Sequence, residues 1–179
     1  MIIFDTETTG LIQNVAKPLA QQPQIIEFYA MKLDDETLEE QGRFHSLFFA
    51  KEVPQEVTSI TGITTEQLKS EPRFSQKFDE LCEFFLGERI LAGHNLSFDR
   101  DMLMFELRRL NMVTNFPWPK RHICTVESTE AMDGFRLSLM ALHEKLFGHK
   151  FDSAHRAQAD VEATAACLRE LVNRGIIEI

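Results

Sequence analysis

Apolar and polar positions along the first fifty residues follow the pattern of β-strands. The run MIIF (1–4) is apolar, and IIEFYAMKL (25–33) and GRFHSLFFA (42–50) are rich in β-branched and aromatic side chains. A segment with two prolines (12–24) separates the first run from the second, and a polar segment (34–41) separates the second from the third. We therefore expect three strands, with an antiparallel meander in this half of the sheet.

The rest of the chain shows mainly helical spacing. Thr64 stands three residues before Gln67, which is the spacing of a capping box, so a short helix should begin there. A further helix is expected over about 74–86, a fourth strand in ILAGHN (90–95), and a helix over 97–112. Two more helices should follow, at 136–148 and about 157–173, each closed by a glycine. This order predicts an α/β fold with a mixed central sheet flanked by helices.

Length and composition are those of an ordinary globular protein. The 179 residues are 44% hydrophobic and 26% charged, which favours a single domain over 1–179. The chain has neither an apolar run of bilayer length nor a signal peptide, so we expect an intracellular, cytoplasmic protein with no membrane partner. The cysteines at positions 82, 124 and 167 are widely spaced and predict neither a disulfide framework nor a zinc site.

The net charge of −9 counts against a protein that grips long duplex nucleic acid through many phosphate contacts. The same charge is compatible with a protein that binds the end of a nucleic-acid strand through metal ions. The densest positive positions are Arg100, Arg108, Arg109 and the stretch 120–122. We interpret them as solvated surface charges, with a small basic rim near a phosphate-bearing substrate as the alternative.

Four carboxylates lie where charge is unfavourable. Asp5 and Glu7 are two apart in a strand and point to one face, so they repel unless something positive lies between them or both are solvated. Asp99 and Asp160 each border the apolar side of a predicted helix. Singly, each fits a strand end or a helix terminus. Together they could converge on one edge of the sheet, where hard oxygen ligands suit Mg²⁺ or Mn²⁺.

Three segments carry a family resemblance. FDTETTG (4–10), GHNLSFD (93–99) and HRAQAD (155–160) resemble, in order and spacing, the three motifs of the DEDDh group of DnaQ-like exonucleases, the family of the proofreading epsilon subunit of DNA polymerase III. The similarity also covers 25–33, 60–68 and 137–148. It implies a ribonuclease H-like fold and 3′→5′ hydrolysis of terminal phosphodiesters to nucleoside 5′-monophosphates.

The resemblance also implies residue roles. The four acids Asp5, Glu7, Asp99 and Asp160 would hold two divalent ions, Mg²⁺ or Mn²⁺, and His155 would be the general base. The residues that would contact the terminal nucleotide are Thr8, Thr9, Leu11, Asn95 and Phe98.

Two departures from the family pattern bear on the substrate rather than on the chemistry. Thr61 and Cys124 stand where many relatives have His and Asp, and neither is an expected metal ligand. We favour DNA with a single-stranded or frayed 3′ end, in proofreading or end trimming, and leave open a DNA polymerase or other replication protein as partner. One alternative is RNA, as in the similar ribonuclease T and oligoribonuclease. The other is a catalytically silent binding domain, which would be expected to lack an acid or the histidine, whereas all five are present.

Overall fold

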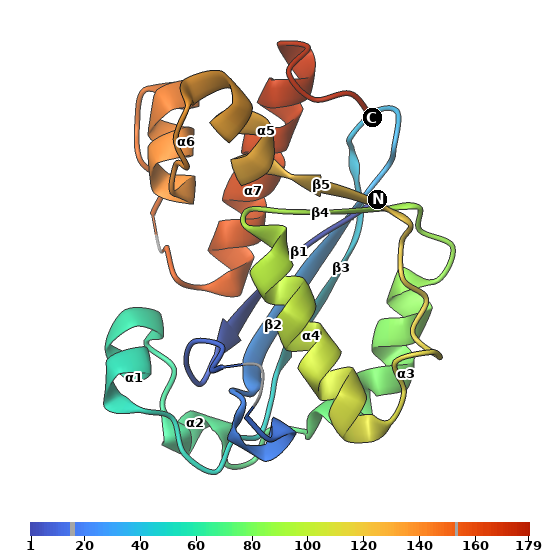
Figure 1. The fold of residues 1–179 in the computed structure, drawn as a ribbon, viewed down its shortest axis with the longest axis vertical. Coiled ribbons are helices and arrows are strands. Elements are labelled where there is room, and N and C mark those ends of the chain that lie inside the picture. Colours follow the sequence, from blue (N-terminus) through green and yellow to red (C-terminus); the bar gives the residue numbers. More distant parts are fainter. Residues whose placement is uncertain (15–16, 153) are drawn as a thin grey trace.

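The computed structural model describes residues 1–14, 17–152 and 154–179 (Figure 1). Its centre is a sheet with the strand order β3-β2-β1-β4-β5. The first three strands pair antiparallel, whereas β4 and β5 run parallel to β1. The predicted mixed sheet is therefore confirmed. The strands are β1 (Ile2–Thr8), β2 (Ile25–Leu33), β3 (Glu40–Leu47), β4 (Ile90–Gly93) and β5 (Arg121–Cys124).

Helices cover both faces of the sheet. Figure 1 shows α3 and α4 on one side and α7 on the other, with α5 and α6 beyond the β4-β5 edge. In the part of the chain that the structure describes, no helix is long and apolar enough to cross a membrane. The helices are the 3₁₀ turn η1 (Leu19–Gln21), α1 (Gln55–Thr61), α2 (Thr65–Leu68), α3 (Phe74–Phe85), α4 (Leu96–Leu110), α5 (Thr125–Asp133), α6 (Leu139–Phe147) and α7 (Ala157–Asn173).

The alternation of side chains in β1 determines where its acids lie. Ile2 and Phe4 belong to the core under α3 and α4, while Ile3 belongs to the core under α7. Since successive side chains of a strand point to opposite faces, Asp5 and Glu7 continue the row of Ile3 toward α7. The strand thus delivers two carboxylates to the same face after its apolar start.

Some elements are absent from the sequence-based prediction. The strand β5 has only four residues and a charged, exposed start, so its local pattern is too short to be distinguished from a loop. The helix α1 begins after Pro54 and buries only one residue, and α5 has little amphipathic character. The strand β5 forms because it pairs with β4, and the local sequence does not indicate that pairing.

Arg109 corrects the interpretation of the basic stretches as surface charges. Its guanidinium is largely buried and lies 2.6 Å from the Glu106 carboxylate. It also donates hydrogen bonds to the backbone carbonyls of Leu19, Gln22 and Pro23 at 3.2, 2.9 and 2.9 Å. Arg109 therefore ties the loop that follows β1 to α4, because it donates to three backbone carbonyls of that loop.

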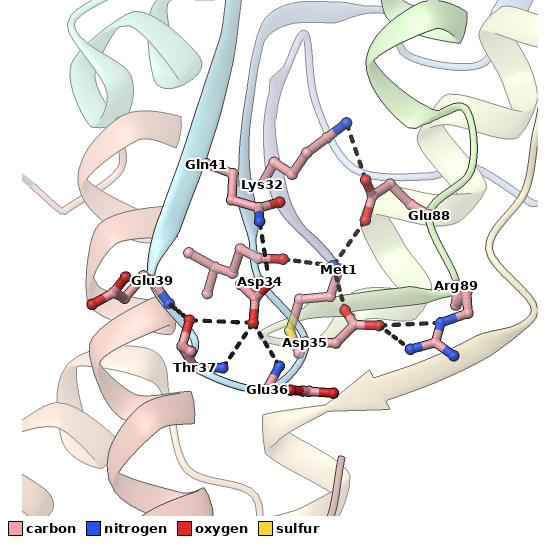
Figure 2. Close-up of polar contacts among 11 residues, drawn as sticks. Met1, Lys32, Asp34, Asp35, Glu36, Thr37, Glu39, Gln41, Glu88 and Arg89 are labelled. Atoms are coloured by element: carbon pink, nitrogen blue, oxygen red, sulfur yellow. Dashed lines mark hydrogen bonds and ion pairs between the residues drawn. The ribbon is translucent and has the colours of Figure 1, made fainter.

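A polar cluster holds the end of β1 opposite to the acids (Figure 2). The ammonium group of Met1 donates to the carbonyl of Leu33 at 2.7 Å and lies 2.6 Å from Asp35 and 2.8 Å from Glu88. Arg89 in turn lies 2.9 Å from Asp35. These contacts join the start of β1 to the β2-β3 turn and to the loop before β4, so both ends of the central strand are fixed.

Candidate active site

A cavity of about 510 Å³ opens where β1 continues past the end of β4. Ile3 pairs with Ala92, so the strand β4 ends while β1 still has several residues to run. The cavity thus lies at the carboxyl ends of two parallel strands, where α/β proteins commonly bind ligands. The described lining residues come from β1, from the loop and helix after β4, from the start of α6 and from the approach to α7; they are Asp5, Thr6, Glu7, His94, Asn95, Phe98, Asp99, Ser138, Leu139, Met140, Phe151, Ala154, His155 and Asp160.

Three carboxylates form the centre of this cavity. Asp5, Glu7 and Asp160 each offer an oxygen atom, and these atoms all lie within 4.8 Å of one another. Two come from β1 and the third from the first turn of α7, which packs on the same face. Clustered carboxylate oxygens are the ligands that hard divalent cations prefer, so this group fits a metal centre.

The fourth predicted acid, Asp99, lies deeper, at the start of α4. It is 4% exposed, and its Oδ1 accepts hydrogen bonds from the backbone N–H of Thr6 at 2.9 Å and from the Thr6 hydroxyl at 2.7 Å. These bonds fix the carboxylate against β1 from the α4 side. Asp99 lines the same cavity as the other three acids and raises the pKa of Asp5 by charge repulsion.

Burial and mutual repulsion raise the pKa of all four carboxyl groups. Desolvation is the main cause in each case, and neighbouring carboxylates add to it. The pKa of Glu7 rises from 4.5 to about 7, and that of Asp99 from 3.8 to about 7. The pKa values of Asp5 and Asp160 also rise. The cavity is therefore a place where negative charge is costly and a cation would be stabilised.

We expect Glu7→Gln to stabilise the protein in chelator in a pH-dependent way. A carboxyl with a higher pKa in the folded than in the unfolded state binds protons more tightly when folded, so the free energy of unfolding falls as the pH rises between the two values. For Glu7 that window runs from 4.5 to about 7. The full effect is about 3 kcal/mol, at about 1.4 kcal/mol per pKa unit.

Urea unfolding of the parent and Glu7→Gln in chelator measures this difference. The variant should match the parent below the window and exceed it in unfolding free energy above about pH 7. Comparing the two proteins cancels the opposite contribution of His94, whose pKa burial lowers to about 4. A variant that is less stable than the parent at every pH would show that Glu7 serves the fold instead.

His155 stands beside the acid cluster in an unusual backbone conformation. Its φ of 67° lies in the left-handed region, and its backbone N–H donates to Oδ2 of Asp160 at 3.0 Å. The side chain is exposed at the mouth of the cavity. The tight turn before α7 therefore places an imidazole and a carboxylate of the same segment on one cavity.

The predicted substrate-contact residues fall into two groups. Asn95 and Phe98 line the cavity, with Asn95 in the left-handed conformation at the start of α4. Thr8 ends β1, Thr9 and Leu11 follow it, and none of the three is among the described lining residues. The Thr8 hydroxyl donates to the carbonyl of Gly10, Thr9 bonds to Gln24, and Leu11 is 75% exposed. The roles of all five stay predictions.

Glu27 is a further residue of this site that none of the sequence motifs indicated, and it holds the start of α7. Its side chain is fully buried, and Arg156 donates to both of its oxygen atoms at 3.0 and 2.9 Å. His45 Nε2 lies 2.9 Å away, and the backbone N–H of Ala157 donates at 3.3 Å. Burial alone would raise the pKa of Glu27, but these bonds outweigh it and hold the pKa below its usual value. The signal in the sequence was the one acidic residue of the largely apolar run 25–33.

We expect the Glu27–Arg156 pair to respond asymmetrically to substitution. Arg156→Met leaves a buried carboxylate without its main partner and should lower the free energy of unfolding by about 3–5 kcal/mol. Glu27→Gln leaves a half-exposed guanidinium that water can solvate, and it removes a charge that repels the other acids, so its cost should be nearer about 2 kcal/mol. Urea unfolding in chelator measures the two losses of unfolding free energy. Equal losses for Arg156→Met and Glu27→Gln would contradict the prediction.

Comparison with known proteins identifies the class. A family model described as Exonuclease matches residues 2–168. The chain is 31% identical over 164 residues to the DNA polymerase III subunit epsilon of Treponema pallidum, covering 88% of this chain and 69% of that protein. It is 32% identical over 188 residues to the PolC-type DNA polymerase III of Latilactobacillus sakei, covering 95% of this chain and 11% of the polymerase.

Solved structures agree with the fold. The nuclease domain of 3′hExo, a DEDDh family member bound to rAMP, superposes with a TM-score of 0.79 at 21% identity, covering 98% of this chain and 92% of that one. Exonuclease X in complex with 5′ overhanging duplex DNA superposes with a TM-score of 0.66 at 23% identity, covering 97% and 92%. The predicted ribonuclease H-like fold is confirmed.

The fold and the acid cluster define a nuclease. The chain belongs to the exonuclease family whose model it matches. This confirms the predicted activity class, an exonuclease.

Proposed function

We propose that this exonuclease removes nucleotides one at a time from the 3′ end of DNA, using two divalent ions, Mg²⁺ or Mn²⁺, held by Asp5, Glu7, Asp99 and Asp160. The observation that carries the proposal is the convergence of three carboxylates within 4.8 Å on a cavity that also contains Asp99 and His155. When bound, the ions would stabilise the attacking and the leaving oxygen atoms of an in-line displacement at phosphorus.

The protein side chains have separate tasks in this reaction. His155 accepts the proton of the attacking water, since an exposed imidazole beside the acids can reach it and histidine is the most frequent general base. Asn95 and Phe98 orient the terminal nucleotide from the start of α4, and Thr8, Thr9 and Leu11 are the candidates for contact from the end of β1 and the segment after it. The water oxygen adds to phosphorus, the bond to the 3′ oxygen breaks, and the leaving 3′ oxygen takes up a proton from solvent. The products are a nucleoside 5′-monophosphate and a strand with a new 3′-hydroxyl.

Similarity to two kinds of DNA polymerase III protein supports DNA as the substrate and proofreading or end trimming as the role. A DNA polymerase is then the natural partner. RNA is the second candidate, because the nuclease domain of 3′hExo was solved with rAMP. Contact with the 2′-hydroxyl decides between the two substrates.

The test uses 5′-labelled single-stranded DNA and RNA of the same sequence with Mn²⁺. We expect a ladder that shortens from the 3′ end and that DNA is degraded faster. Closed circular single-stranded DNA is the control and should stay intact, since it has no 3′ end. Cleavage of the circle would contradict exonuclease action, and faster degradation of RNA would reverse the substrate assignment.

A further inference from the structure

The loop between α5 and α6 is fastened to the end of β4 by one histidine. The carbonyl of Leu137 lies 3.1 Å from His94 Nε2, and the Thr125 hydroxyl lies 2.8 Å from His94 Nδ1. A carbonyl can only accept, so Nε2 carries the proton and the neutral ring accepts at Nδ1 from the hydroxyl. The loop begins at Gly134, whose φ of 75° lies in the left-handed region. The loop backbone is therefore tied to the end of β4 at Leu137.

Two side chains of this fastened loop remain open to solvent. Phe135 is 58% exposed, and the Arg136 side chain is 52% exposed. After Leu137, the residues Ser138, Leu139 and Met140 line the cavity. Phe135 and Arg136 therefore precede a cavity-lining segment, and Arg136 contacts the lining residue Asn95. Binding residues lie disproportionately on loops that a rigid scaffold positions.

Arg136 is also joined to the site by a side-chain contact. Its Nη2 donates to Oδ1 of Asn95 at 3.1 Å, and its Nη1 lies 3.3 Å from the exposed carboxylate of Glu130. An exposed ion pair of this kind contributes little to stability, so the Arg136 guanidinium can leave Glu130 and bind another anion. Among the described residues that line the cavity there is no lysine or arginine. Arg156 lies near but is engaged by buried Glu27.

We propose that Phe135 and Arg136 form a subsite for the nucleotide that precedes the 3′-terminal one, with the guanidinium on a strand phosphate and the ring stacked on a base. This inference rests on the proposed function. A strand that approaches the carboxylate cluster is repelled, and a guanidinium beside Asn95 offsets this repulsion while its fork matches a phosphate. Stacking on an aromatic ring tolerates any base, as end trimming requires.

Two substrates separate this subsite from the reacting centre. The p-nitrophenyl ester of thymidine 5′-monophosphate has no upstream phosphate, whereas a single-stranded oligonucleotide does. Arg136→Gln should raise KM for the oligonucleotide about tenfold or more, because it removes a charged hydrogen bond. The variant removes one hydrogen bond to Asn95, which stays at the N-terminus of α4, so kcat/KM for the ester should fall far less than kcat/KM for the oligonucleotide. The dependence of log kcat/KM on log salt should flatten by about 0.7, the contribution of one single-strand phosphate contact.

Matched variants complete the test. Arg174→Gln makes the same charge change at the far end of α7, where Arg174 pairs with Glu170, and should alter neither substrate. Phe135→Leu should raise KM for the oligonucleotide about fivefold or more, and Phe135→Trp should restore it. Equal losses of Arg136→Gln on both substrates, or no loss on either, would overturn the subsite.

A binding measurement keeps the two proposals apart. Fluorescence anisotropy of a labelled oligonucleotide in Ca²⁺ should show the same rise in Kd for Arg136→Gln as the rise in KM, whether or not the protein turns the substrate over. Loss of the ester and oligonucleotide activities in the parent would count against the proposed function. An unchanged Kd would count against the subsite alone.

Discussion

Replacing Asp5 with asparagine is expected to abolish hydrolysis and, at the same time, to raise the melting temperature of the protein in chelator. Asp5 lies between the other acids, and its pKa is raised by burial, then by Asp99, Asp160 and Glu7. Removing its charge while keeping its shape relieves that repulsion. Each kcal/mol gained should raise the melting temperature by about 2–4 °C in a chain of this size.

The hydrolytic activity of Asp5→Asn should fall, although its melting temperature in chelator rises. An ion at a reacting phosphate contributes several kcal/mol of charge stabilisation, so kcat should fall by about 10³-fold or more when a ligand is lost. With saturating Mn²⁺ the difference in melting temperature between Asp5→Asn and the parent should shrink or change sign, because the parent binds the ion more tightly. Asp79→Asn, on the exposed face of α3, is the control and should change neither property. A lower melting temperature of Asp5→Asn in chelator would mean that Asp5 serves the fold through hydrogen bonds.

Replacing His155 should lower kcat by about 10²–10⁴-fold, which is the range for a positioned general base. His155→Asn is the sharper variant, because asparagine tolerates the left-handed conformation at φ 67° and keeps a polar side chain but cannot accept a proton near neutral pH. The backbone N–H that donates to Asp160 is retained, so metal binding should persist.

Single-turnover rates and a Mn²⁺ titration of the same protein measure the two properties separately. His122→Ala, on the exposed part of β5, provides the control for loss of an imidazole. A rate within about threefold of the parent would exclude His155 as the base, given the range above. If His155→Asn lost Mn²⁺ affinity together with its rate, His155 would be assigned to the metal site instead.

Local patterns in the sequence predict the elements that position the acids. The strand expected at 25–33 is observed as Ile25–Leu33, and the helix expected at about 157–173 as Ala157–Asn173, because both have long apolar patterns. The pair Asp5 and Glu7 could be assigned to one face because strand side chains alternate with a period of two. The convergence of Asp160 on that pair follows from the packing of α7 on β1.

What the sequence does not reveal depends on contacts between distant segments. Glu27 is the one acidic residue of a largely apolar strand, and its partner Arg156 lies 129 positions away. Arg109 reads as a surface charge, and only the path of the loop after β1 brings three carbonyls to it. The strand β5 depends on pairing with β4. Spacing alone contains no information about such pairings.

The central claim is that Asp5, Glu7 and Asp160 bind a catalytic divalent cation, and anomalous diffraction from crystals grown with Mn²⁺ tests it most directly. We predict a manganese peak within bonding distance of the Asp5 carboxylate, about 2.0–2.2 Å, with Glu7 or Asp160 as a second ligand. The Asp5→Asn protein in the same crystals should lose the peak. The claim would be contradicted if the parent, at a Mn²⁺ concentration that supports full hydrolysis, showed no peak in this cavity or bound the ion elsewhere.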